Sequence, residues 1–361
     1  MGIQVVRGVI AAASIEGPER FVFAVGHPHP DGDHGGGPGP ATRWREPSSF
    51  GAYVDLVDEL CDPDDASWEL DVVDHLASFR DGQVDLVALP NQGRIGQLVM
   101  PRPDQVLATV LWGNSLSYVA RVNTTTRAVE TFSPTGVPEG AHVVHAALVG
   151  EQVLLLAVLG GATRAGLARL EGEALVWAQD LGTIPEEVTA LDARLTADGA
   201  LVAYAGGEHL WQLTGTRWAD VHSGGGGPCV RVVVLSDGGV VAGNERGDVV
   251  AGRGLECRQV ARLGELRSAA QFRGSLYVAD QERVYRLDDG PTPVFTPPEE
   301  SVGDWPSTGA LVGTADRLYL AGAHSLASTA DGTSWSLHDI GEPERVFEPA
   351  EPEDGESDEE E

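Results

Sequence analysis

The chain has 361 residues, 42% of them hydrophobic, and a formal net charge of -31 at pH 7. This acidic balance predicts repulsion from phosphate backbones and from anionic lipid surfaces, so it argues against nucleic-acid and membrane partners. All 24 basic residues are arginine. The absence of lysine excludes the Walker A loop, the kinase strand lysine, pyridoxal-phosphate Schiff bases and the Ser-x-x-Lys acyl-transfer motif.

The first segment predicts two strands, Val5–Ala12 and Phe21–Val25, joined by a turn at Gly17-Pro18. Its single positive charge and short apolar run do not fit a signal peptide. No apolar run in the chain approaches the ~20 residues of a membrane span, so we expect a cytoplasmic protein. The cysteines, Cys61, Cys229 and Cys257, are too few for a disulfide framework, and we expect them to be reduced thiols in the core.

Residues 26–81 are predicted to form an insertion. Its first half, from His27 to Arg45, is rich in glycine, proline and histidine and should lack regular structure. Its second half, from Ser49 to Arg80, predicts two helices in a hairpin, because apolar residues recur at helical spacing on two faces, the second from Trp68 to Phe79. An apolar hairpin of this kind either packs on the body of the protein or binds another protein. The candidate partner-binding residues are Phe50, Val54, Val57, Leu60, Trp68, Val72, Leu76 and Phe79.

From about residue 104 onward, turn signals recur at intervals of roughly 36 to 49 residues, each between two short apolar runs. Later strands of each repeat are more polar, as expected when inner strands are buried and the outermost strand faces solvent. The repeat resembles that of WD-repeat-like β-propellers, although the Trp-Asp dipeptide is missing. The turns are Gly113-Asn114, Gly150-Glu151, Asp198-Gly199, Asp237-Gly238-Gly239, Arg273-Gly274 and Ala315-Asp316.

We therefore predict an all-β fold over residues 1–341, a β-propeller of about seven blades, with six and eight as alternatives. The insertion would interrupt the first blade, whose outer strands are expected at Val84–Leu89 and Ile95–Met100. By the same resemblance, the N-terminal strand is expected to close the ring onto the last blade.

The segment Ser328-Thr329-Ala330-Asp331-Gly332-Thr333-Ser334-Trp335 resembles the Asp-box turn of sialidase-type propellers. Ala330 stands where that family has its aspartate, and Asp331 follows one place later. In those propellers the Asp-box is a structural turn on an outer hairpin. The resemblance therefore implies a fold and no activity.

Three histidines and two aspartates lie close together in His27-Pro28-His29-Pro30-Asp31-Gly32-Asp33-His34. These side chains suit zinc, iron or nickel, so His27, His29 and His34 are candidate metal ligands. The segment resembles the metal loop of metallo-β-lactamases, His-x-His-x-Asp-His, but Gly32 replaces the last histidine. A polar loop without a metal is the preferred interpretation, and no cofactor is expected. A second candidate is a calcium site at the tunnel mouth, built on Asn244 and Glu245.

Residues 342–361 carry eleven carboxylates against one arginine, Arg345. This composition predicts a disordered acidic tail that either raises solubility or docks onto a basic surface.

Because no catalytic constellation stands out, the sequence favours a non-enzymatic protein-recognition or scaffold subunit of a larger bacterial assembly. Its expected partner is another protein with a basic surface. One alternative is a metal-dependent hydrolase that uses the His27–His34 loop or the tunnel calcium site. Another is a regulator that a partner protease cleaves.

Overall fold

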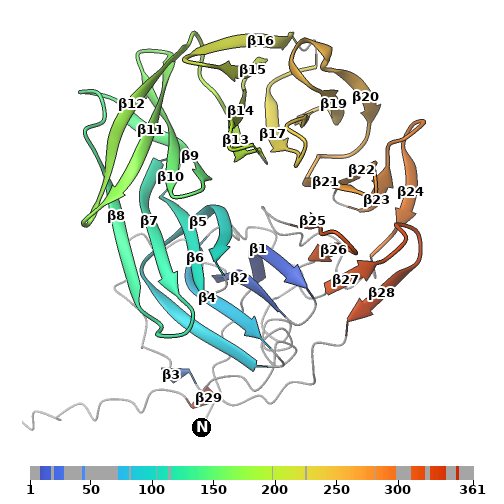
Figure 1. Ribbon diagram of the computed structural model, residues 1–361, viewed down its shortest axis with the longest axis horizontal. Coiled ribbons are helices and arrows are strands. Elements are labelled where there is room, and N and C mark those ends of the chain that lie inside the picture. The colour runs from blue at the N-terminus through green and yellow to red at the C-terminus, as the bar shows by residue number, and fades with distance from the viewer. Residues whose placement is uncertain are drawn as a thin grey trace, which may run out of the picture.

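The computed structural model describes residues 9–17, 20–27, 43–44, 72–80, 83–102, 104–112, 115–196, 198–223, 226–280, 282–297, 310–321, 326–338 and 347–348. Within these ranges the chain is all-β, with one short 3-10 turn, η1 (Gly254–Glu256), and no α-helix. Figure 1 shows sheets standing side by side around a common centre. In this part of the chain no helix is long and apolar enough to span a membrane.

The first antiparallel unit combines strands from both sides of the predicted insertion with one strand, β4, from within it. β2 pairs with β1 on one side and with β4 on the other, and β4 pairs with the first part of β5. The bounds are β1 (Val9–Gly17), β2 (Arg20–His27), β4 (Val72–Arg80) and β5 (Gln83–Arg102).

The long strand β5 belongs to two units. Its residues up to Gly93 pair with β4, and those from Arg94 onward pair with β6. The second unit therefore contains the second part of β5, β6 (Gln105–Trp112), β7 (Ser115–Asn123) and β8 (Val129–Thr135). The third contains β9 (His142–Val149), β10 (Gln152–Leu159), β11 (Ala162–Glu171) and β12 (Ala174–Ile184).

The outermost strands of the second and third units, β8 and β12, pair in parallel. Together with the shared strand β5, this pairing joins the first three units into one sheet of eleven strands. The strands from β13 to β28 form four separate four-stranded sheets. They are β13 (Ala190–Leu195), β14 (Leu201–Gly206), β15 (His209–Thr214), β16 (Arg217–Ser223); β17 (Cys229–Val234), β18 (Val240–Asn244), β19 (Asp248–Gly252), β20 (Arg258–Arg262); β21 (Ser268–Phe272), β22 (Ser275–Ala279), β23 (Val284–Arg286), β24 (Thr292–Phe295); and β25 (Leu311–Gly313), β26 (Leu318–Ala321), β27 (Leu326–Thr329), β28 (Trp335–His338).

The ring brings the first and last units together, since β1 lies close to β26 (Figure 1). β1 itself pairs with β2 in the first sheet. The predicted closure, in which the N-terminal strand joins the last blade, is therefore wrong for the described strands. The blade count of about seven stays a prediction, because the first units share β5 and form one continuous sheet.

The hydrophobic core lies between neighbouring units. On β6, for example, Val106 and Val110 pack in a cluster with the first unit, whereas Leu107 and Leu111 pack with the third. All four are nearly inaccessible. Because both faces of such a strand are buried, the sequence reads as a continuous apolar run. Each buried valine or leucine contributes about 1.5–3 kcal/mol relative to exposure.

The predicted second helix is wrong over residues 72–79, which belong to strand β4. Val72, Leu76 and Phe79 have helical spacing, but short apolar runs of this kind also fit a buried strand. Pairing with the neighbouring strands selects the strand conformation, since Phe79 lies opposite Phe21 on β2 and Val84 on β5. Leu76 is buried in the core at 2% exposure, so it is not available to a partner. The other predicted hairpin residues, Phe50, Val54, Val57, Leu60 and Trp68, lie outside the described residues.

Because residues 72–80 form a strand, the strands that follow take other places in the sheet than predicted. The third strand of the first unit is β4, Val84–Leu89 lies in the fourth strand, and Ile95–Met100 is the inner strand of the second unit. The connection between β2 and β4 therefore spans residues 28–71 and not 26–81. A short strand inside it, β3 (Arg43–Trp44), pairs with β29 (Phe347–Glu348). The prediction of disorder from residue 342 onward is wrong for these two paired residues.

Candidate functional site

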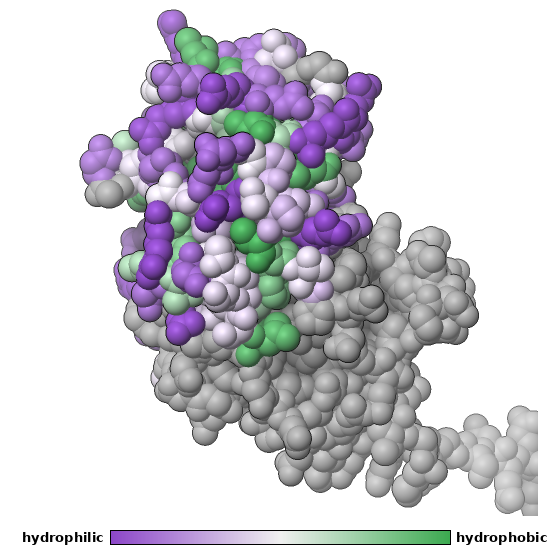
Figure 2. All heavy atoms as spheres, turned by 90° about the vertical axis from the view of Figure 1, so that its right-hand side faces the viewer, coloured by the Kyte–Doolittle hydropathy of each residue, from purple (hydrophilic) through white to green (hydrophobic). Residues whose placement is uncertain are grey.

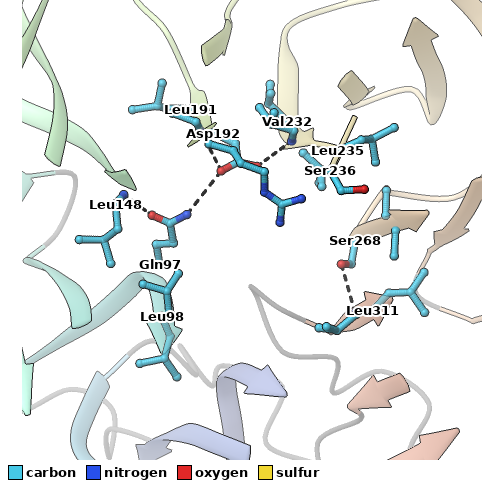
Figure 3. A pocket seen from close by; sticks show the side chains of 18 of the residues that line it. Gln97, Leu98, Leu148, Leu191, Asp192, Val232, Leu235, Ser236, Ser268 and Leu311 are labelled. Atoms are coloured by element: carbon cyan, nitrogen blue, oxygen red, sulfur yellow. Dashed lines mark hydrogen bonds between the residues drawn. The ribbon is translucent and has the colours of Figure 1, made fainter. Parts of the chain in front are cut away.

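A central channel is enclosed by the inner strands β5, β9, β13, β17, β21 and β25. Its cavity volume is about 510 Å³. This is within the range of about 300–1,000 Å³ that is usual for ligand sites. Leucine or valine residues occur on all of these strands except β21, and the labelled polar side chains lie at two places, Gln97 with Asp192 and Ser236 with Ser268 (Figure 3).

Asp192 on β13 and Gln97 on β5 together connect strands from four different units. Its Oδ1 accepts the amide of Ala193 at 2.8 Å, and its Oδ2 accepts the amide of Val234 on β17 at 2.7 Å. Gln97 on β5 donates from Nε2 to Asp192 Oδ1 at 3.4 Å, and its Oε1 accepts the amide of Leu148 on β9. Figure 3 shows this chain of contacts across the channel wall. Two side chains thus tie together β5, β9, β13 and β17.

Burial raises the pKa of Asp192 from its ordinary value of 3.8 to about 6. The Val234 hydrogen bond and the Arg194 guanidinium act in the opposite direction but do not cancel it. A carboxyl with this pKa in a cavity is a functional-site candidate. It also has a structural explanation, because it satisfies two main-chain donors that water reaches poorly.

Arginines supply most of the charge in the channel wall. Among the described residues, its ionisable side chains are Asp192, Arg194 on β13, Arg231 on β17 and Arg267 just before β21. Arg194 and Arg231 both act electrostatically on Asp192. Arg267 Nη1 lies 3.3 Å from Glu265 Oε1, while its Nε is buried without a hydrogen-bond partner. The described part of the channel wall is therefore locally positive in a chain of net charge -31.

A second pocket of about 300 Å³ lies between the β13–β16 and β17–β20 sheets, and Asn244 lines it. The predicted calcium site required Asn244 at the tunnel mouth, so that placement is wrong. Asn244 Oδ1 accepts the amides of Arg246 and Asp248 at 3.0 and 2.9 Å, which closes a turn. Among the described residues, no group of three or more His, Cys, Asp and Glu side chains could hold a metal.

The same pocket contains His209 and Cys229. His209 Nδ1 lies 2.7 Å from Asp220 Oδ2, so a histidine, a carboxylate and a thiol lie near one cavity. Cysteine catalysis needs a thiolate. Burial instead raises the pKa of Cys229 to about 12 and that of Cys257 to about 11. Both thiols are free and buried, as predicted, and Cys61 lies outside the described residues.

The histidine loop falls almost wholly outside the described residues. His27 is the last residue of β2, while His29 and His34 belong to the part of the chain that is not described. The metal site at His27, His29 and His34 therefore stays a prediction.

The Asp-box-like segment forms a local turn between β27 and β28. Asp331 Oδ1 accepts the amides of Thr333 and Ser334 at 2.8 and 2.7 Å and the hydroxyl of Thr329 at 2.9 Å. Gly332 has a φ of +82°. A Cβ there would lie 2.0 Å from Tyr277 Oη on β22, so the glycine allows the turn to pack on the neighbouring sheet.

No protein-family model and no curated protein sequence matches the chain. Solved structures do. The structure of YCF48 bound to a D1 peptide has 14% identity and a TM-score of 0.50, and the match covers 69% of this chain and 82% of that one. The fold is a β-propeller.

A second similar structure is PorZ, a surface component of the type-IX secretion system of Porphyromonas gingivalis. It has 10% identity and a TM-score of 0.50, and the match covers 96% of this propeller but only 39% of PorZ. A chain of the mitotic checkpoint complex has 10% identity and a TM-score of 0.48 over 74% of this chain and 82% of that one. At sequence identities this low, the similarity shows a common fold and gives no information about function.

The channel cluster of Asp192, Arg194, Arg231 and Arg267 was not predicted from the sequence. A signal was present, because Asp192, Arg194 and Arg231 interrupt inner strands that are otherwise apolar. A charged residue in such a strand must face either the core or the axis of the ring, and the axis is far less costly.

Proposed function

We propose that this propeller is a non-enzymatic recognition subunit that holds a segment of a partner protein at its central channel. The observation that carries the proposal is the channel itself, which combines the arginines Arg194, Arg231 and Arg267 with accessible apolar side chains such as Leu195. Arginines beside apolar surface are typical of protein-binding sites. The similar propeller YCF48 has a peptide bound to it, which supports a protein partner.

The outer surface supports the same assignment. Figure 2 views one side of the ring, where the described residues are mostly hydrophilic and the apolar side chains form small, separate groups. Large apolar patches usually mark docking surfaces. On this side the described rim offers none, which favours the channel over the rim as the binding site.

Co-purification from the native host tests the proposal. We expect a partner that is retained by the full chain and lost when Arg194 and Arg231 are both changed to glutamate. The matched control is Arg169→Glu with Arg217→Glu, which makes the same charge change at two exposed positions on outer strands. Equal recovery with both double variants would overturn the channel as the binding site.

The same experiment addresses the insertion. The variant should lack residues 28–71 only, because a deletion of 26–81 would remove strand β4 and its core residue Leu76. Loss of the partner only in this deletion would move the binding site to the insertion.

We also propose the setting, the role and the partner surface of this protein. They are a bacterial cytoplasmic assembly, a scaffold role, and a partner whose surrounding surface is basic and thus complementary to the net charge of -31. The metal-dependent hydrolase and the protease-cleaved regulator stay alternatives that no specific feature of the described residues favours.

A further inference from the structure

We propose that the partner segment recognised by the channel is acidic, and that its carboxylates are bound by Arg194, Arg231 and Arg267. This inference rests on the proposed function and names the chemistry of the segment that enters.

Positive charge in the channel wall favours an acidic ligand. Among the described residues, three arginines and one aspartate face a single cavity, and Glu265 pairs with Arg267. The net charge of these groups is positive whether or not Asp192 is protonated. Asp192 has both of its oxygens engaged by amides of Ala193 and Val234. It is therefore held as part of the wall, and guanidinium groups remain the main charged groups that a ligand would meet.

The arginines come from neighbouring inner strands, which is the second argument. Arg194 lies on β13, Arg231 on β17, and Arg267 immediately before β21. The main chain of Arg267 is fixed, because its amide donates to Ala279 O at 2.8 Å. Guanidinium groups on rigid strands suit carboxylate oxygens, which accept two parallel N–H bonds from one arginine.

The orphaned Nε of Arg267 is the third argument. This donor is buried and has no hydrogen-bond partner, although Nη1 of the same side chain reaches Glu265. Buried donors without a partner are uncommon in native proteins and call for an acceptor. A small shift of the side chain toward an entering carboxylate would satisfy it.

Size and polarity favour a peptide over a small ion. A volume of about 510 Å³ is far larger than one carboxylate or phosphate group needs. Leu191, Leu195 and Val233 line the same cavity as the arginines, and their side chains are partly or well exposed. A segment that alternates acidic and apolar side chains would use both kinds of surface.

The overall charge sharpens selectivity. A net charge of -31 repels acidic chains at long range, and the repulsion is screened beyond about 8 Å at physiological ionic strength. An acidic segment gains only if it inserts among the arginines. Acidic chains that cannot enter the channel are therefore rejected.

The test is calorimetric titration of the full-length chain at 0.15 M salt with three probes. They are an acetylated six-residue peptide of alternating leucine and glutamate, the same peptide with glutamine in place of glutamate, and inorganic phosphate. We expect the glutamate peptide to bind and the glutamine peptide to bind at least about ten-fold more weakly.

Arg194→Gln and Arg231→Gln should each weaken the glutamate peptide about ten-fold. The control Arg217→Gln, on the exposed outer strand β16, should change affinity less than about two-fold. Thermal melting of each variant shows whether it is folded. Should Arg231→Gln unfold the protein, Arg194→Gln alone decides, because Arg194 is exposed to the channel.

Several outcomes would overturn the inference. One is equal binding of the two peptides, and another is unchanged affinity in the channel variants. Binding of phosphate without the peptide would assign the site to a free oxyanion. If the co-purifying partner depends on the channel arginines while the glutamate peptide does not bind, the recognition function stands and only the acidic segment is wrong.

Discussion

Asp192 in the channel wall and Asp331 in the outer turn of the last sheet each accept two main-chain amides at 2.7–2.8 Å. Their pKa values nevertheless move in opposite directions. Burial raises the pKa of Asp192, whereas the amides of Ser334 and Thr333 lower that of Asp331, which is fully exposed. Main-chain hydrogen bonds of equal number and length therefore do not set the charge state, and burial decides which effect is larger.

The two sites also differ in what they connect. The partners of Asp331 all lie within three residues of it in the chain. Asp192 instead meets Val234 and Gln97, which are 42 and 95 residues away. One site forms a turn, and the other holds inner strands of the ring together. Substitutions at both sites should separate these two roles.

Gly332→Ala should have the largest effect, because this residue links the local turn to the next sheet. The new Cβ would clash with Tyr277 Oη at 2.0 Å, and the φ of +82° disfavours an L-residue. Overpacking costs about 1–3 kcal/mol and the left-handed conformation about 1–2 kcal/mol, so unfolding free energy should fall by about 3 kcal/mol. Urea denaturation followed by fluorescence measures this.

Gly274→Ala is the matched control. Gly274 has the same φ of +82°, but a Cβ there meets nothing within 4 Å. Its cost should therefore be the conformational part alone, about 1–2 kcal/mol. Equal losses in the two variants would mean that the contact with Tyr277 contributes nothing.

Asp192→Ala should have the next largest effect and lower the free energy of unfolding by about 2 kcal/mol, because removing an acceptor leaves poorly hydrated donors unpaired. The affected donors are the amides of Ala193 and Val234 and Nε2 of Gln97. Chemical denaturation at pH 5 measures this loss, since ionisation of Asp192 contributes less to the free energy of unfolding there than at pH 7. No change would show that channel water replaces the carboxylate.

Asp192→Asn isolates the charge. The folded pKa of about 6 exceeds the ordinary 3.8, so this carboxyl favours folding fully below pH 3.8, and that contribution is lost as pH rises through about 6. One pKa unit corresponds to about 1.4 kcal/mol, and with allowance for water in the channel the loss should be about 2 kcal/mol between pH 4 and pH 7. The asparagine variant should lack this fall, whereas parallel pH curves for the two proteins would contradict it.

Asp331→Asn should have the smallest effect and the opposite pH dependence. The pKa of Asp331 is held below its ordinary value, so its contribution is present above pH 3.8 and lost as pH falls further. At pH 7 the variant should be slightly less stable than the unmodified protein, and near pH 3 the difference should narrow. Thermal melting at the two pH values measures both differences.

The sequence by itself determined the architecture and its local details. Turns at a repeat of roughly 40 residues predicted the propeller, because each turn is encoded by a few adjacent residues. The Asp-box-like turn could be recognised for the same reason, since Thr329, Asp331 and Gly332 suffice to form it. Buried free thiols at Cys229 and Cys257 followed from composition.

Only the tertiary structure decided the identity of β4 and the site in the channel. Residues 72–80 fit a helix and a strand equally well by pattern, and pairing with β2 and β5 selected the strand. Asp192, Arg231 and Arg267 come from separate repeats, so no local pattern places them at one cavity. The physical reason is that strand pairing and burial are long-range, whereas turn propensity is contained in neighbouring residues.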